Sequence, residues 1–207
     1  TVFIYEGYEQ ICDSEGLSAP RLKLSARLLR NFSTSELRHI LAKELYHHKA
    51  GHIRLEIMAD KILGLINAVP NLPGINLLNS VGGGTAFGLM ALNLRDTAFR
   101  WFRSACFSAE NFAVCFNGDL KSSLSATLMT TLNERQLVEK VSLHEYIEQV
   151  SKIEICQGPA ATMERINECL PYGPYRVQNM LRFVLSEVGS EFYSQFASGE
   201  KRLDGNV

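Results

Sequence analysis

The chain has 207 residues, of which 46% are hydrophobic and 21% charged, and its formal net charge is −1 at pH 7. This charge balance argues against a nucleic-acid partner, because phosphate binding requires a concentrated excess of Lys and Arg. The length suits a single globular domain over 1–207. Five cysteines without a short repeating spacing predict reduced thiols and a cytoplasmic location rather than a disulfide framework.

The N-terminal part predicts two strands followed by a helix. Residues 1–13 begin with β-branched and aromatic side chains, and residues 20–29 alternate enough to form a second strand. Ser33 then precedes Glu36 by three residues, which is the spacing of a capping box at a helix start. Apolar residues follow at helical spacing and predict the buried face, which Glu44 and His48 continue: Leu37, Ile40, Leu41 and Leu45.

A stretch of the chain without charged residues runs from Ile62 to Leu94. It is long enough to cross a bilayer, but asparagines, two prolines and three consecutive glycines interrupt it. We therefore predict two buried or lid-like helices in 62–94, joined by Pro/Gly turns as a helical hairpin or lid. Membrane contact is not expected.

The remaining residues are predicted to be mostly helical. Two helices are expected in 95–132 with a break near Asn117 and Gly118, and another over 134–154. Residues 168–180 read as an irregular loop, and an amphipathic helix should run from Val177 to Phe196, before a polar tail that frays over 200–207. The predicted class is α+β, mostly α, with a small N-terminal sheet.

The segment "LAKELYHHKAGH", residues 41–52, differs in one position from the zinc-binding pattern H-E-x-x-H. In such a site two histidines four residues apart bind the ion, and the glutamate holds the attacking water. Glu44 occupies the position of the glutamate and His47 that of the second histidine, but Lys43 stands where the first ligand should be. A lysine binds a metal ion only after losing its proton beside a dication.

Residues from about 22 to 200 resemble the HtpX-related family of zinc metallopeptidases, specifically its small soluble members. The segments "LSARLLRNFSTSELRHILAKELYHHKAGH" and "WFRSACFSAENFAVCFNGD" are similar to the two helices that hold the zinc ion in that family. The resemblance implies a metallopeptidase-like (zincin) fold. It also places Cys106 where the third ligand, a glutamate, should be, and Glu110 where a supporting aspartate should be. "YGPYRVQNM" is similar to a late His-Pro-Arg segment, of which only Arg176 remains.

The fold implied by this resemblance should bring four side chains to one point, namely Lys43, Glu44, His47 and Cys106. Glu110 and Arg176 are expected to support binding there. No metal is expected, because two of three ligands are replaced; His47 and Cys106 would be the ligands if an ion bound. His48 and His52 would lie about 100° round the same helix from the Lys43/His47 pair, and read as a solvated helix end.

Single residues outside these motifs have simpler interpretations. We predict His39 to be a surface residue and His144 a lone histidine without a partner. Three aromatic side chains at helical spacing are predicted to belong to the core: Trp101, Phe102 and Phe107.

Three functions remain open from the sequence. In the first, the chain is a pseudo-peptidase whose former active-site groove binds a peptide, a protein or a small-molecule ligand without cutting it. In the second, it is a metal-free enzyme that uses Lys43, Glu44, His47 and Cys106 for acid-base or covalent catalysis, with Lys43 lowering the pKa of the Cys106 thiol. In the third, it is a residual zinc metallopeptidase.

Overall fold

The structure is a computed structural model that describes residues 1–7, 12–16, 21–68, 83–155 and 171–197. Three short strands near the N-terminus form one mixed sheet: β1 (Val2–Tyr5), β2 (Cys12–Glu15) and β3 (Arg21–Ser25). β3 is central, pairing parallel with β1 and antiparallel with β2. The first predicted strand, expected to lead into a short helix or loop by residue 13, corresponds to β1, and β2 begins within that segment at Cys12. The second predicted strand corresponds to β3, which ends where the first helix begins.

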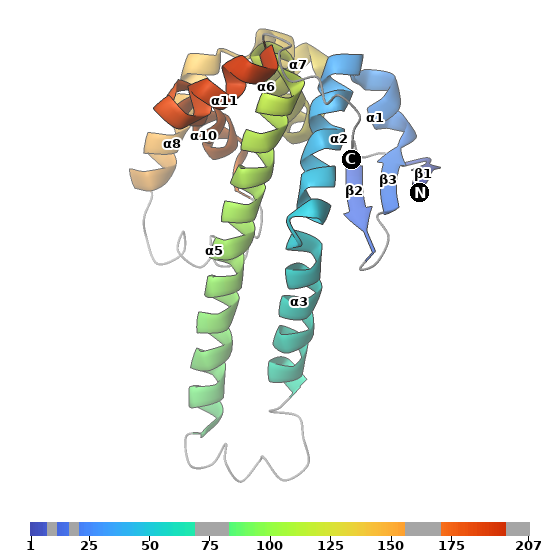
Figure 1. The fold of residues 1–207 in the computed structure, drawn as a ribbon. Coiled ribbons are helices and arrows are strands. Elements are labelled where there is room, and N and C mark those ends of the chain that lie inside the picture. The colour runs from blue at the N-terminus through green and yellow to red at the C-terminus, as the bar shows by residue number, and fades with distance from the viewer. Residues whose placement is uncertain (8–11, 17–20, 69–82, 156–170, 198–207) are drawn as a thin grey trace.

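All other described elements are helices, so the predicted mostly helical class with a small N-terminal sheet is confirmed. They are α1 (Ala26–Asn31), α2 (Thr34–Lys49), α3 (His52–Ala68), α5 (Gly83–Asn117), α6 (Leu120–Leu132), α7 (Arg135–Lys140), α8 (Leu143–Ile155), α10 (Gly173–Leu185) and α11 (Glu187–Ala197). In Figure 1, the sheet lies on one side of α2, while α6 to α11 gather round the upper part of α5. The contacts of α2 with both α5 and β2 place it between the helices and the sheet.

The start of α2 forms as its sequence predicts. The Ser33 side chain accepts a hydrogen bond from the backbone N–H of Glu36, and the Glu36 carboxylate accepts one from the backbone N–H of Ser33. Glu36 is buried and also binds Arg135, whose Nη1 lies 2.7 Å from Glu36 Oε1. The capping box thus joins α2 to the region after α6.

The buried face of α2 agrees with the predicted one only in part. Leu45 is 48% exposed, whereas His39, predicted to be at the surface, is fully buried. Helix α2 turns a partly polar side toward its neighbours, because its carboxylates find partners there, and the buried residues on it are Glu36, His39, Ile40, Ala42 and Glu44. Of the predicted stripe, Ile40 and Glu44 are buried, and Leu37 and Leu41 pack, partly buried, against the core cluster that contains Ile40.

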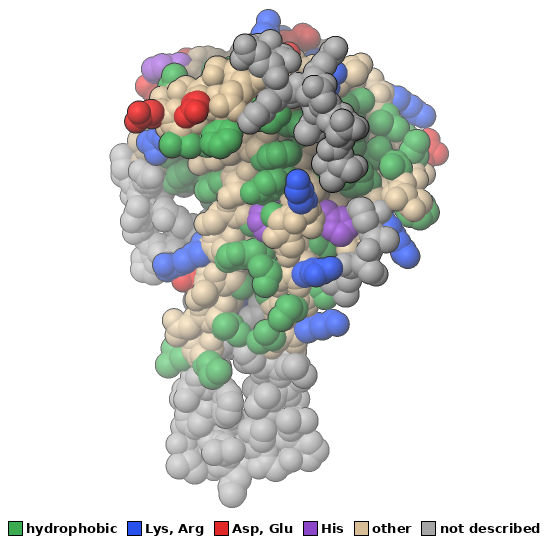
Figure 2. Space-filling view, in the orientation of Figure 1, with side chains coloured by type: hydrophobic (Ala, Val, Ile, Leu, Met, Phe, Trp, Pro, Cys, Tyr) green, Lys and Arg blue, Asp and Glu red, His purple; other side chains and the backbone are tan. Residues whose placement is uncertain are grey.

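The uncharged stretch falls on two long helices that extend beyond it. α3 and α5 lie side by side and project away from the rest of the chain (Figure 1). The predicted pair of helices is present, but its buried alternative does not hold for four apolar side chains of this stretch, since Ile62, Leu89, Met90 and Leu92 are 44–62% exposed. The lid-like alternative stays a prediction. Figure 2 shows hydrophobic side chains on the surface of the projecting part, with Lys or Arg side chains nearby. The turn between the helices, residues 69–82, lies outside the described residues, and none of the described helices is long and apolar enough to cross a membrane.

The C-terminal half confirms the predicted break after Asn117, where Gly118 has a φ of 65° and Asp119 caps α6. The helical stretch from 134 to 154 consists of α7 and α8. The prediction of a loop over 168–180 is wrong from Gly173 onward, because Pro174 sits in the first turn of α10, where its missing N–H costs nothing. The predicted final helix is interrupted at Ser186 between α10 and α11. Residues 200–207, predicted to fray, are outside the described part.

Candidate functional site

The four residues singled out around the degenerate motif line one cavity. Its volume is about 240 Å³, and its walls come from β2, α2, α3 and α5. Lys43, Glu44 and His47 line it from α2, and Cys106 lines it from α5. The convergence of these side chains, expected from the sequence, is therefore present in the structure.

Lys43 and Glu44 form an ion pair within this cavity. Lys43 Nζ lies 3.3 Å from Glu44 Oε1, and the two side chains are only 16% and 10% exposed. The second oxygen of Glu44 accepts a hydrogen bond of 3.2 Å from Ser14 Oγ on β2. Burial lowers the pKa of Lys43, but the charge of Glu44, together with the other acidic groups nearby, outweighs this effect and the net pKa is raised. Lys43 is therefore a fixed ammonium in the position where the first metal ligand was expected.

The thiol of Cys106 is protonated at neutral pH. Burial and the charge of Glu110 raise its pKa to about 11, and the opposing charges of Lys43 and Arg176 do not compensate. The charge of Lys43 does lower this pKa, as expected, but burial of the side chain, which is 3% exposed, and the charge of Glu110 raise it by more. A thiol in this state is a poor nucleophile, since the thiolate is the reactive form.

His47 is paired with His52, a residue that the sequence did not assign to the site. Their Nδ1 atoms are 3.0 Å apart, so one ring donates a hydrogen bond and the other accepts it. The sequence interpretation placed His52 on the same helix as His48, but α2 ends at Lys49. Gly51, with a φ of 76°, redirects the chain, and α3 begins at His52. A glycine just after a helix is the usual signal for such an ending, and could have indicated this turn.

Both histidines of this pair are neutral at pH 7. Burial, the charge of Lys43 and the neighbouring His52 lower the pKa of His47 to about 3, and burial lowers the pKa of His52. The His52 ring also contacts the edge of Trp101, with ring centroids 5.4 Å apart. Trp101 and Phe102 line the cavity and are half-buried, as is Phe107, so these aromatic residues are not the closed core that their spacing predicted.

Glu110 and Arg176 bind each other instead of lining the cavity. Arg176 Nε donates a hydrogen bond of 2.6 Å to Glu110 Oε1, and Nη2 of the same guanidinium contacts that oxygen too. Glu110 is fully buried, and its charge raises the pKa of Arg176 against the lowering effect of burial. This ion pair joins α5 to α10. The charges of Glu110 and Arg176 contribute to the pKa shifts of Lys43 and Cys106, which line the cavity.

The side chains in the cavity do not fit a zinc ion. Among the described residues, no three His, Cys, Asp or Glu side chains are arranged to hold a metal. An ammonium stands beside the glutamate, Cys106 keeps its proton, and Nδ1 of His47 is hydrogen-bonded to His52. His47 and Cys106 alone would offer two donors where a zinc site needs three or four.

His144, also singled out in the sequence, does not line the cavity. His144 is on α8, is 83% exposed, and has Nδ1 3.7 Å from a carboxylate oxygen of Glu148. It is a surface residue with a nearby acidic neighbour rather than a site residue.

Comparisons with known proteins do not assign the chain to a family. No family model matches the chain, and neither curated proteins nor solved structures give a match.

Proposed function

We propose that the chain is a metal-free relative of the zinc metallopeptidases, a pseudo-peptidase whose former metal site binds a peptide group without cutting it. The observation that carries this proposal is the ion pair of Lys43 with Glu44 in the cavity. In a metallopeptidase the glutamate must be free to take a proton from water that the metal polarises. Here the carboxylate is held by Lys43 and by Ser14, and the positive charge of the lysine takes the place of the ion.

The size of the cavity favours a small occupant. At about 240 Å³ it lies just below the range of common small-molecule sites, roughly 300–1,000 Å³. A single side chain or the end of a peptide suits this volume better than a folded protein surface. Trp101 and Phe102 offer apolar contact area, while Asp13 and Glu56 supply negative charge to the lining.

Catalysis without a metal has weaker support. General acid-base groups work best when their pKa lies near the ambient pH. His47, with a pKa of about 3, and Cys106, with a pKa of about 11, are both shifted away from neutrality. The enzymatic alternative therefore depends on Glu44, and a variant of that residue separates the two functions.

The test combines a binding readout with a turnover readout. A mixture of short peptides is added to protein labelled with ¹³C at the histidine rings, and the same mixture carrying quenched fluorophores is used to detect cleavage. We expect the His47 and His52 resonances to shift, that of the exposed His144 to stay in place, and no cleavage to occur. Cleavage that disappears in Glu44→Gln would establish the enzymatic alternative, and unchanged His47 and His52 resonances would overturn peptide binding.

A further inference from the structure

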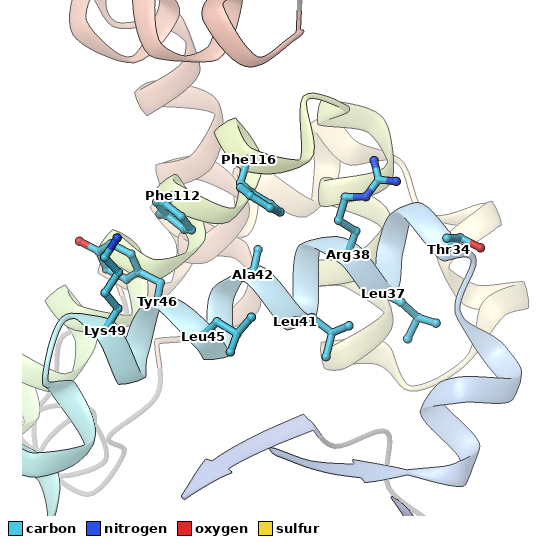
Figure 3. Close-up of a pocket in the computed structure, with 10 residues that line it drawn as sticks. All are labelled: Thr34, Leu37, Arg38, Leu41, Ala42, Leu45, Tyr46, Lys49, Phe112 and Phe116. Carbon is cyan, nitrogen blue, oxygen red and sulfur yellow. The ribbon is translucent and has the colours of Figure 1, made fainter. Parts of the chain in front are cut away.

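A second hollow lies on the other face of α2 from the cavity, between α2 and α5 (Figure 3). Its volume is about 520 Å³. Leu37, Leu41 and Leu45 form a row along α2, and Phe112 and Phe116 from α5 complete the lining. We call this hollow the leucine groove.

The leucine groove presents apolar side chains that the helix pattern would normally bury. Leu45 is 48% exposed and Phe116 is 39% exposed, although both belong to long helices in contact with each other. Contiguous exposed apolar surface of this kind commonly marks an interaction site.

The aromatic side of the groove is already ordered. Tyr46 stacks on Phe112 with ring centroids 4.8 Å apart and an interplanar angle of 25°. Phe112 stacks in turn on Phe116 at 5.9 Å and 18°. A row of stacked rings loses little conformational freedom when a partner docks, which lowers the cost of binding.

The charges at the groove are of one sign. Its only charged lining residues are Arg38 and Lys49, both exposed, and neither makes an ion pair with another described residue. They are eleven positions apart on α2, which is three helical turns, so both lie along the same edge at a separation of about 16 Å. An occupant with negative charges spaced by three turns would match both cations.

We propose that the leucine groove docks an amphipathic helix of a protein partner. The apolar face of that helix packs on the leucine row and on the two phenylalanines, and acidic side chains three turns apart along one edge pair with Arg38 and Lys49. A helix laid in an apolar groove is a common mode of peptide recognition, read through apolar anchors one turn apart. This surface is separate from the Lys43 cavity and does not depend on what binds there.

The test selects peptides from a displayed library of helical sequences, with random surface positions, on the whole chain. Sequences that bind are then counter-selected on Leu45→Glu, and Leu185→Glu serves as the matched control, because Leu185 is an 83% exposed leucine outside the groove. We expect the surviving peptides to carry apolar residues one turn apart and acidic residues along one edge. A library that yields no peptide dependent on Leu45 would overturn the proposal.

The charge match is tested on the most enriched peptide by fluorescence anisotropy. Its affinity should fall about tenfold or more in the double variant Arg38→Glu/Lys49→Glu, and a version with lysines in place of the acidic residues should then bind that variant better than the wild type. Equal affinity for wild type and double variant would contradict an acidic partner. Self-association of the chain that is lost in Leu45→Glu would instead identify a second copy as the occupant and overturn the proposal.

Discussion

The ammonium of Lys43 lies 3.3 Å from the carboxylate of Glu44, at the position where the sequence pattern H-E-x-x-H carries its first histidine. Both groups are largely buried, and Ser14 on β2 holds the other carboxylate oxygen. Replacing one member of a buried ion pair with a neutral residue lowers the stability of the fold, because the remaining buried charge has no partner. The same carboxylate that pairs with Lys43 in the cavity therefore also holds α2 to β2.

Removing the lysine should destabilise the chain. We expect Lys43→Met to lower the free energy of unfolding by about 3 kcal/mol, because Glu44 is left charged and buried. Lys43→Met/Glu44→Gln should recover much of this loss. The matched control is Lys23→Met, since the Lys23–Glu15 pair is 43% exposed on both sides and should contribute less than about 1 kcal/mol. Urea unfolding measures all four proteins, and equal losses for the two lysines would contradict a buried pair.

Stability should fall as the pH drops below 6.5. The pKa values of His39 and His47 are lowered from 6.5 to about 3, so the folded state stays neutral there while the unfolded state binds protons. The stabilisation is complete above pH 6.5 and is lost progressively down to about pH 3. Each such histidine contributes a slope of about 1.4 kcal/mol per pH unit. His47→Asn should reduce the slope between pH 6 and pH 5 by about one proton; an unchanged slope would show that His47 titrates normally.

Cys106 should react slowly with alkylating reagents. Burial raises the pKa of Cys106 and of Cys115 to about 11 in each case, so neither forms much thiolate at pH 7.5. Alkylation by iodoacetamide, followed at each cysteine by mass spectrometry, is expected to modify the two at similar low rates in the folded protein. Selective rapid labelling of Cys106 would instead support the covalent form of the enzymatic alternative.

Gly51 should be needed for the position of His52. Its φ of 76° is strained for other residues, although a Cβ there would meet no atom within 4 Å. Gly51→Ala should therefore cost about 1 kcal/mol through the backbone alone. Gly64→Ala is the control: this glycine lies inside α3, a Cβ there also meets no atom within 4 Å, and the change should stabilise the helix by about 0.5–1 kcal/mol. Thermal unfolding distinguishes them, and a stabilising Gly51→Ala would contradict the turn.

The sequence predicted the parts of the fold that depend on local chemistry. The Ser33–Glu36 capping box formed as expected, because its hydrogen bonds lie within one turn of a helix. The convergence of Lys43 and Glu44 with Cys106 was also predicted, from the resemblance of two helices that are far apart in the chain.

The sequence predictions were wrong where contacts between distant parts of the chain determine which side chains are buried. Periodicity assigned Leu45 to the interior and His39 to the surface, but α2 buries its polar side because Arg135, Lys43 and Ser14 provide partners for the carboxylates there. His52 was missed because one continuous helix was assumed across Gly51. A residue with a left-handed backbone conformation changes the direction of the chain. The 100° rotation per residue of a helix therefore no longer predicts where the side chains after it point.

Whether an ammonium takes the place of a metal ion in this cavity is tested most directly by elemental analysis after dialysis against zinc. Wild type is compared with Lys43→His/Cys106→Glu, which restores the ligand types of a metallopeptidase, and with Lys43→Met/Cys106→Glu, which lacks the first imidazole. We predict about one zinc per chain in the first double variant only. About one zinc per wild-type chain, lost in Cys106→Ala, would contradict the account and identify a surviving metalloenzyme.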